Sequence, residues 1–403
     1  MRAPRHLIFG SGQRAATPHY VRMYATRVLV VTDQRVHHDP ALAAILTDLT
    51  SVGISVAVFD GVEAELPLSC VERGAAVGAS QAVEMVIGLG GGSCIDAAKV
   101  IALLLAHGGR AQDYYGELKV PGATLPVMAV PTTAGTGSEV TPIAVLDDPS
   151  RATKIGIASP HLVPLVSICD PELTLTCPPG LTAASGADAL THAIESFMTL
   201  RRASSADLSV QHVFIGKNAL SDGFALQAVR LIGGSLEAAV KSGNDVQARS
   251  DMMLGSTLAG LAFGVSGTGA AHAIQYPVGA LTHTPHGLGV ASLMPYVMAW
   301  NRPACEEQLA EIGAALGASQ VGTLAGRAIA AIRAVADLYD RISIPKTIAL
   351  LGVAEPSLGS IAEGAMSAER LIKNSPRKLD LPGMTAIVRA SFEGSLDDLL
   401  ANP

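Results

Sequence analysis

The hydrophobic pattern of this chain changes once along its length, and that change constrains the fold more than any other feature. Before about residue 178, short runs rich in Val and Ile alternate with helical patterns, and each run is bounded by Gly, Asp or Pro. These runs lie at residues 28–32, 55–59, 85–88, 126–131 and 165–168. Such runs are typical of strands in a mostly parallel sheet buried on both faces. The first part of the chain is therefore predicted to be an α/β domain.

The pattern after about Leu181 is helical. Long Ala- and Leu-rich stretches recur at helical spacing there, and strand-like runs nearly vanish. These stretches predict helices over 206–240, 248–262 and 321–339. The turn-rich segment Cys177-Pro-Pro-Gly180 marks the change. We therefore expect an α/β domain over residues 1–178 and an all-helical domain over residues 179–403.

Composition excludes several classes of function. Hydrophobic residues make up 49% of the 403 residues and charged residues only 16%, which is typical of a packed globular protein. The net charge is −7 and Lys and Arg do not cluster, so neither nucleic acid nor an anionic membrane surface is an expected partner. The longest purely apolar run, residues 100–106, is far shorter than the ~20 residues that span a bilayer.

The start of the chain and its cysteines indicate a cytoplasmic protein. The first ten residues carry positive charge but no apolar stretch of signal-peptide length. The five cysteines are odd in number, scattered along the chain and never spaced as Cys-x-x-Cys. We interpret them as reduced thiols, so any metal must be held by His and carboxylate ligands.

A glycine-rich segment, residues 84–99, runs from an apolar strand into a helix. Gly90, Gly91 and Gly92 allow backbone N–H groups to approach an anion, and Ser93 with Asp96 predicts a capping box for the helix. A helix N-terminus behind bare glycines suits a pyrophosphate, although a tight strand-to-helix turn is the alternative. The third Gly of the ordinary dinucleotide fingerprint is missing, and so is the Gly-Lys-Ser/Thr of a Walker A loop. We therefore expect a dinucleotide site of different connectivity.

Asp33 is the candidate acid for the coenzyme ribose. It directly follows the strand predicted over 28–32, and the carboxyl end of such a strand faces the ligand crevice of an α/β sheet. A carboxylate there can hold ribose hydroxyls and repel a 2′-phosphate, which favours NAD over NADP. A helix N-cap is the alternative role for Asp33.

A second polar loop, residues 131–141, also follows an apolar run. Its hydroxyls and glycines suit contacts to the ribose and phosphates of the coenzyme. The candidate residues here are Thr132, Thr133, Thr136 and Thr141, and Lys154 offers a cation shortly after them.

Two residues at helical spacing suggest a metal site. Asp188 and His192 are four residues apart, which places them on one face of a helix. The alternative is that Ser185 and Asp188 form a capping box and that His192 is an ordinary helix histidine.

Further histidines follow in the helical part of the chain. His272 lies in an Ala-rich helical stretch, and His283 and His286 come shortly after it. Three imidazoles and one carboxylate suit Fe(II), with Zn(II) as the alternative, and leave room for a substrate oxygen.

Taken together, these motifs resemble the iron-containing (group III) alcohol dehydrogenases over nearly the whole chain. The matching segments are Phe-Gly-x-Gly at 9–12, Gly-Gly-Gly-Ser-x-x-Asp-x-x-Lys at 90–99, Pro-Thr-Thr-x-Gly-Thr-Gly-Ser-Glu at 131–139, Asp-Pro-Glu-Leu-Thr at 170–174, Asp-Ala-Leu-Thr-His-Ala-Ile-Glu at 188–195, Pro-His-Gly at 285–287 and Asn-x-Pro-Arg at 374–377. The resemblance implies an α/β dinucleotide-binding domain and an all-helical metal-binding domain. It also implies the metal ligands Asp188, His192, His272 and His286. The implied coenzyme positions are Asp33, Gly91, Gly92, Ser93, Asp96, Thr132, Thr133 and Lys154.

One position departs from the family pattern. Many members have a further His four residues after the third metal ligand, and this chain has Tyr276 there. Tyr276 is similar to the residue found in the hydroxyacid-oxoacid transhydrogenase branch. We therefore take Tyr276, or His283 close by, as the candidate proton relay.

The expected activity is hydride transfer between a small alcohol and NAD, with the metal as a Lewis acid that lowers the pKa of the alcohol. The substrate is expected to be a small alcohol or aldehyde, or a hydroxy acid, and the protein is expected to be a homodimer. The alternatives are a hydroxyacid-oxoacid transhydrogenase, a maleylacetate reductase-like enzyme, which the intact ligand set disfavours, and a non-catalytic metal- and nucleotide-binding protein.

Overall fold

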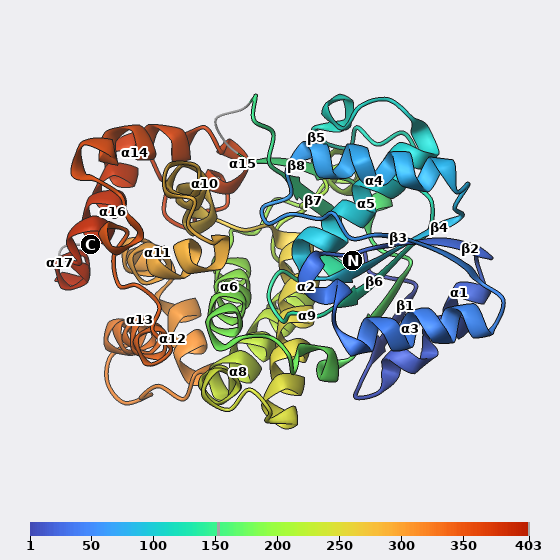
Figure 1. Ribbon diagram of the computed structural model, residues 1–403. Helices are drawn as coiled ribbons and strands as arrows, with labels where there is room; N and C mark the ends of the chain where they lie inside the picture. Colours follow the sequence, from blue (N-terminus) through green and yellow to red (C-terminus); the bar gives the residue numbers. More distant parts are fainter. Residues whose placement is uncertain (151–153, 402–403) are drawn as a thin grey trace. The chain divides into compact units, whose positions relative to one another are not determined.

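The computed structural model describes residues 1–150 and 154–401, which form two compact units (Figure 1). The first unit comprises Met1–Cys177 together with Ala206–Val213. The second comprises Pro178–Ser205 together with the chain from Phe214 onward. None of the helices within the described ranges is long and apolar enough to cross a membrane.

The first unit is built on a six-stranded sheet in which every pair of neighbours is parallel. Its strands, from one edge to the other, are β1 (His6–Phe9), β9 (Val166–Cys169), β6 (Val127–Pro131), β4 (Met85–Gly90), β2 (Arg27–Val31) and β3 (Ser55–Phe59). The chain runs from β2 outward to β3 and then crosses back to β4 on the other side of β2. The strand order therefore reverses between β2 and β4, the kind of position at which open α/β sheets bind ligands.

Both faces of this sheet are buried, which explains the continuous apolar runs of its strands. Along β2, Leu29 and Val31 belong to one core cluster, whereas Val28 and Val30 belong to the other. The helices α4 (Leu68–Ser80) and α5 (Gly92–His107) supply the first cluster. The helices α1 (Thr17–Arg22) and α3 (Pro40–Ser51) supply the second. The prediction of a parallel sheet buried on both faces is confirmed.

The five predicted strands are all present, but four other strands were not predicted. These are β1 and the strands of a small second sheet, ordered β5 (Gly116–Glu117), β8 (Ile155–Ala158) and β7 (Ile143–Leu146). Each is only two to four residues long. The edge strand β1 begins with a polar His6 and is only four residues long, and β8 contains a glycine, so neither gives the long apolar run on which the prediction relied.

The regular elements described in the second unit are all helices (Figure 1). Its helices are α6 (Pro179–Met198), α8 (Ala219–Lys241), α9 (Val246–Ser266), α10 (Ala270–Thr282), α11 (His286–Asn301), α12 (Glu306–Ala315), α13 (Leu324–Arg341), α14 (Leu358–Met366), α15 (Glu369–Ile372), α16 (Leu381–Glu393) and α17 (Leu396–Ala401). Helix α6 is buried along almost its whole length because α8, α9 and α11 pack against it. The small residues of α6 allow this close packing.

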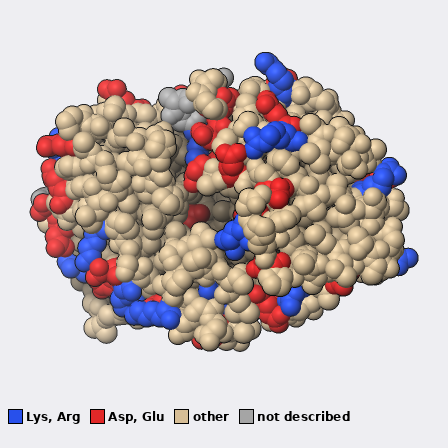
Figure 2. All heavy atoms as spheres, viewed as in Figure 1, with Lys and Arg blue, Asp and Glu red and all other residues tan. Residues whose placement is uncertain are grey.

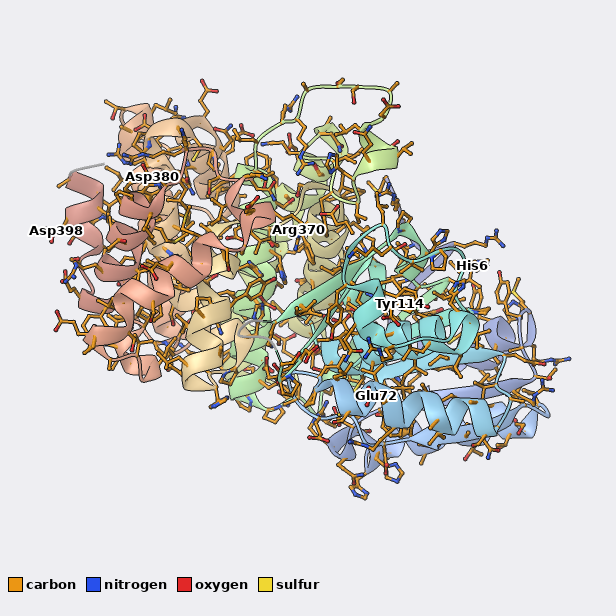
Figure 3. All side chains as sticks on the ribbon, turned by 90° about the horizontal axis from the view of Figure 1, so that it is seen from above. His6, Glu72, Tyr114, Arg370, Asp380 and Asp398 are labelled. Atoms are coloured by element: carbon orange, nitrogen blue, oxygen red, sulfur yellow. The ribbon has the colours of Figure 1, made fainter. Side chains whose placement is uncertain are left out.

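Side-chain caps fix where several of these helices begin. Thr323 accepts a hydrogen bond from the Gly326 N–H at the start of α13, and Asp380 accepts one from the Gly383 N–H at the start of α16 (Figure 3). Such caps satisfy backbone N–H groups that have no partner within the helix, and each contributes about 1 kcal/mol.

The single helix predicted over 206–240 is wrong in its first part. Residues 208–211 form the one-turn helix α7 (Leu208–Gln211) of the first unit, and α8 begins only at Ala219. Asn218 caps α8, since its side chain accepts from the N–H groups of Leu220 and Ser221. The helical spacing of apolar residues continues in the sequence on both sides of Asn218, whereas helix α8 begins only after this residue.

Charged side chains are dispersed over the surface. On the face drawn in Figure 2, the basic residues are scattered and several of them stand beside acidic ones. Exposed ion pairs of the chain include Arg73 with Glu63 and Arg341 with Glu237. Pairs of this kind contribute little to stability, so the stability of each unit must come mainly from its buried core and its helix caps.

One cation of the first unit is fully buried. Lys99, on α5, has no exposed surface, and its ammonium donates to Ser138 Oγ at 2.8 Å and to the carbonyl of Ile143 at 2.7 Å. It also contacts the Thr141 side chain at 3.3 Å and lies 3.6 Å from the Asp96 carboxylate. Burial lowers the pKa of Lys99 to about 8, although Asp96 opposes this shift. Lys99 thus ties helix α5 to the loop that follows β6.

We predict that Lys99→Met destabilises the first unit by about 3–5 kcal/mol, because Asp96 and several oxygens would be left buried without their cation. Urea unfolding followed by circular dichroism measures the change. The matched control is Lys119→Met at an exposed site, which should change stability by less than about 0.5 kcal/mol. Equal stabilities of the two variants would contradict this role for Lys99.

Candidate functional site

The glycine loop joins β4 to α5 and leaves the N-terminus of that helix without a side-chain cap. Helix α5 begins at Gly92, and its N-cap is Gly91, which makes no side-chain capping bond. Gly90 has a φ of +153°, and a Cβ at this residue would lie 2.5 Å from the sulfur of Cys94. Only glycine fits there. The exposed N–H groups of the first turn fit an anion such as a pyrophosphate.

The predicted capping box of Ser93 and Asp96 is wrong. Ser93 lies inside the first turn of α5 and does not cap it. The Asp96 carboxylate instead accepts from the Ser138 hydroxyl, and from the Val145 N–H at 2.9 Å. Burial raises the pKa of Asp96, while Lys99 opposes that shift. Asp96 is thus part of the polar contacts around Lys99, and so is Thr141.

Asp33 caps a helix and also faces the glycine loop. Its Oδ1 accepts from the Val36 N–H at 2.8 Å, which makes it the N-cap of α2 (Gln34–His37). Its Oδ2 lies 3.6 Å from the sulfur of Cys94 in the first turn of α5. The two roles considered for Asp33 are therefore compatible in space, because the cap uses only one carboxylate oxygen.

The threonine-rich loop lies against the glycine loop. The Thr132 N–H donates to the carbonyl of Gly90 at 2.9 Å. Thr136 stands so close to Gly92 that a Cβ there would overlap it, and Thr133 lies beside Gly91. The structure thus gathers these three threonines at one end of β4. Lys154 forms an ion pair with Glu65.

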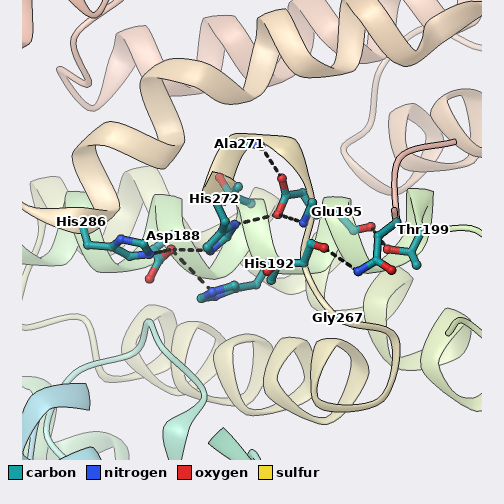
Figure 4. A network of polar contacts seen from close by, with 12 residues as sticks. Asp188, His192, Glu195, Thr199, Gly267, Ala271, His272 and His286 are labelled. Atoms are coloured by element: carbon teal, nitrogen blue, oxygen red, sulfur yellow. Dashed lines mark hydrogen bonds and ion pairs between the residues drawn. The ribbon is translucent and has the colours of Figure 1, made fainter. Parts of the chain in front are cut away.

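Asp188, His192, His272 and His286 converge in the helical unit (Figure 4). The Nε2 atoms of His192 and His272 each lie 3.7 Å from Asp188 Oδ1, and that of His286 lies 3.8 Å from it. Asp188 and His192 are one turn apart on α6. His272 lies on α10 and His286 is the first residue of α11. Ser185 lies well inside α6, so the alternative of a capping box with Asp188 is wrong.

Asp188, His272 and His286 fit a divalent metal ion, because their ligand atoms all lie within 4.8 Å of one another. His192 does not belong to this group of three, although its Nε2 faces Asp188 Oδ1 at 3.7 Å. Ligands of zinc lie about 2.0–2.2 Å from the ion, so two ligands of one ion stand about 3 to 4 Å apart. The distances of 3.7–3.8 Å from the three Nε2 atoms to Asp188 Oδ1 fall in this range. The Nε2 of His272 is buried and makes no hydrogen bond within the described part of the chain. A buried nitrogen without a partner is costly unless an ion or water satisfies it.

Glu195 holds His272 in position and was not predicted. Its Oε2 lies 2.6 Å from His272 Nδ1, while its two oxygens accept from the N–H groups of Gly269 at 2.7 Å and Ala271 at 2.8 Å (Figure 4). Burial lowers the pKa of His272, but Glu195 and Asp188 outweigh it, and the pKa is raised. The sequence did carry a signal, because Asp188, His192 and Glu195 follow helical spacing on one face of α6.

Gly287 allows α11 to approach α6. A Cβ at this residue would overlap the backbone carbonyl of Ala184 and lie 3.3 Å from the Cβ of Asp188. The Pro-His-Gly motif thus has a packing reason, since the glycine lets the helix that carries His286 lie directly against the helix that carries Asp188.

The two candidate relay residues lie in different surroundings. Tyr276 is half-buried on α10, one turn after His272, and burial raises its pKa while Arg370 opposes this shift. Arg370, on α15, lies over the ring of Phe214 at 4.5 Å (Figure 3). His283 is exposed at the C-cap of α10, and its side chain makes no hydrogen bond within the described ranges.

Family models match both units. A model of iron-containing alcohol dehydrogenases matches residues 4–171, and the C-terminal model of the Fe-containing alcohol dehydrogenase family matches residues 182–392. Similar proteins include long-chain-alcohol dehydrogenase 1 of Geobacillus thermodenitrificans, 37% identical over 94% of this chain and 93% of that protein. The NAD-dependent methanol dehydrogenase of Bacillus methanolicus is 34% identical over 91% of this chain and 92% of that protein.

Solved structures agree with this assignment. The crystal structure of a 1,3-propanediol oxidoreductase is 35% identical, with a TM-score of 0.90, over 97% of this chain and 98% of that one. NAD and a divalent metal are typical of the family. The chain therefore belongs to the iron-containing alcohol dehydrogenase family and is an NAD-dependent oxidoreductase that acts on CH–OH groups.

Proposed function

We propose that this protein oxidises a small alcohol, or reduces the corresponding aldehyde, with NAD and one Fe(II) ion. The observation that carries the proposal is the convergence of three imidazole nitrogens on Asp188 Oδ1 at 3.7–3.8 Å. Similar proteins are named for long-chain alcohols, methanol and 1,3-propanediol. This range supports an alcohol substrate without selecting one. Zn(II) is the alternative metal, since imidazole and carboxylate ligands accept both ions.

In this proposal Asp188, His192, His272 and His286 hold the metal. When bound, the ion acts as a Lewis acid that lowers the pKa of the alcohol, and the nicotinamide takes the hydride. Glu195 fixes the ring of His272 with Nε2 directed toward Asp188 and with the proton on Nδ1. A carboxylate behind a metal-binding histidine also raises the basicity of that ligand.

We assign the coenzyme to the glycine loop and the residues around it. The N–H groups behind Gly91 and Gly92 would bind the pyrophosphate, as the first turn of α5 offers no competing side chain. Asp33 has one oxygen engaged in the cap, and the other would accept from the ribose. Thr132, Thr133 and Thr136 supply hydroxyls at the same end of β4. Gly90, Ser93 and Lys154 remain candidate contacts.

Tyr276 is the better candidate for the proton route. It lies one helical turn from His272, whereas His283 is an exposed C-cap residue. A phenol is already protonated at neutral pH, and burial raises the pKa of Tyr276 further, so its O–H would donate a hydrogen bond to a substrate oxygen.

A second candidate function is transhydrogenation between a hydroxy acid and an oxo acid with retained NAD. Tyr276 favours it, and so does the cation of Arg370, which acts on both Tyr276 and His272 and would attract a carboxylate. Sustained release of NADH with a simple alcohol, followed at 340 nm, would argue against this alternative.

The central test is an activity screen of the iron-loaded protein with alcohols, aldehydes and hydroxy acids, with NAD and NADP in parallel. We predict that His272→Ala loses both bound metal and turnover, because the metal would lose a ligand and Glu195 would lose its partner. Metal content by mass spectrometry and turnover by absorbance measure these effects. His161→Ala, at an exposed site, is the control. Full activity in a metal-free His272→Ala variant would exclude the mechanism.

We predict that Glu195→Gln lowers metal affinity by about 10–100-fold, as is usual when the carboxylate behind a metal-binding histidine is lost. Competition with a chelator measures the affinity. The exposed Glu311→Gln variant removes the same charge and should bind metal like the unmodified protein. An unchanged affinity in Glu195→Gln would show that His272 does not need this partner.

We predict that Gly287→Ala abolishes tight metal binding while the glycine-loop unit still binds NADH. The added methyl group would push α11 away from α6 and separate His286 from Asp188. Chelator competition and NADH fluorescence measure the two effects. Gly359→Ala is the control, because a Cβ there meets no neighbouring atom. Retained metal affinity in Gly287→Ala would contradict the packing argument.

A further inference from the structure

Arg35 reaches across the carboxyl end of β4. It lies in α2, which follows β2, and its Nη2 donates to Thr132 Oγ1 at 3.2 Å. Thr132 directly follows β6. Since β2 and β6 flank β4 on opposite sides, a hydrogen bond between Arg35 and Thr132 must pass over the point where β4 ends and the glycine loop begins. This path brings the guanidinium close to the glycine loop, where the N-terminus of α5 has no side-chain cap.

The other cations assigned to this part of the unit are engaged elsewhere. Lys99 is fully buried, and its ammonium donates to the oxygens of Ser138, Thr141 and Ile143. Lys154 forms an ion pair with Glu65. A pyrophosphate carries two negative charges, whereas a helix N-terminus supplies only about half of one positive charge. A further cation at the loop would therefore strengthen the binding of a dinucleotide.

Arg35 has unused hydrogen-bonding capacity. Its side chain is exposed, and within the described residues its contact with Thr132 is its single side-chain hydrogen bond. A guanidinium has five N–H donors in a planar arrangement that suits two phosphate oxygens. Asp33, two residues earlier, does not pair with it, because its oxygens face the Val36 N–H and the Cys94 thiol.

We propose that Arg35 is a coenzyme-binding residue whose guanidinium pairs with the pyrophosphate of the dinucleotide above the glycine loop. The inference rests on the proposed use of NAD. Thr132 holds the arginine over the loop before the coenzyme arrives, so little side-chain entropy is lost on binding. Asp33, two residues before Arg35, is expected to select against the 2′-phosphate of NADP. Arg35 is proposed to contact the pyrophosphate, which NAD and NADP share.

The test is direct binding to the full-length protein, without turnover. NADH and NADPH are titrated by their fluorescence, and ADP-ribose and adenosine compete with NADH. The variants are Arg35→Gln, which removes the positive charge, and Arg35→Lys, which keeps the charge but replaces the planar guanidinium with an ammonium. Arg110→Gln is the matched control, because Arg110 is exposed and lies just beyond the C-terminal end of α5.

We expect Arg35→Gln to weaken binding of NADH, NADPH and ADP-ribose by about tenfold to a hundredfold, and Arg35→Lys by less. Adenosine binding, and all binding by Arg110→Gln, should stay unchanged. A loss that is much larger for NADPH than for NADH would overturn the assignment, since Arg35 would then face the 2′-phosphate. Unchanged NADH binding in Arg35→Gln would overturn it as well. If the unmodified protein binds no NADH, the proposed coenzyme itself is wrong.

Discussion

The buried carboxylate of Glu195 is the interaction on which the arrangement of the metal ligands depends. It accepts from the backbone of Gly269 and Ala271 and from the ring of His272, so one side chain of α6 fixes both the start of α10 and the ligand that α10 carries. Burying a carboxylate is costly, and three N–H donors at 2.6–2.8 Å offset that cost. Gly287 complements this contact by bringing α11 against the same helix.

In the first unit, a buried cation has the part that the buried carboxylate of Glu195 has in the second. Lys99 is buried in α5, and the groups around it belong to the threonine-rich loop and the segment after it. Its ammonium holds that loop beside the glycine loop, while the N-terminus of α5 stays free of side-chain caps. In each unit, a buried charged group on a central helix fixes a neighbouring segment: Lys99 fixes the threonine-rich loop, and Glu195 fixes the start of α10.

Much of this arrangement could be predicted from the sequence, and what could not has physical reasons. The five long apolar runs predicted strands correctly, because a sheet buried on both faces leaves that pattern. Helical spacing placed Asp188 and His192 on one face. The prediction of a Ser93–Asp96 capping box was wrong because the Asp96 carboxylate points into the core, toward the buried Lys99. Helical spacing also places Glu195 on that face, but its contact with His272, like that of Arg35 with Thr132, joins residues far apart in the sequence and is not visible in a local pattern.

The four converging residues come from three helices and span nearly one hundred positions of the chain, so an ion can bind them only after those helices have packed. Under the proposed function, the free energy of metal binding therefore adds to the folding free energy of the helical unit, and to that unit alone. The supply of metal would change the stability of the helical unit and leave that of the α/β unit unchanged. In a metal-poor cell, the helical unit would lose this contribution, so it would open more often and be cleaved by proteases more readily.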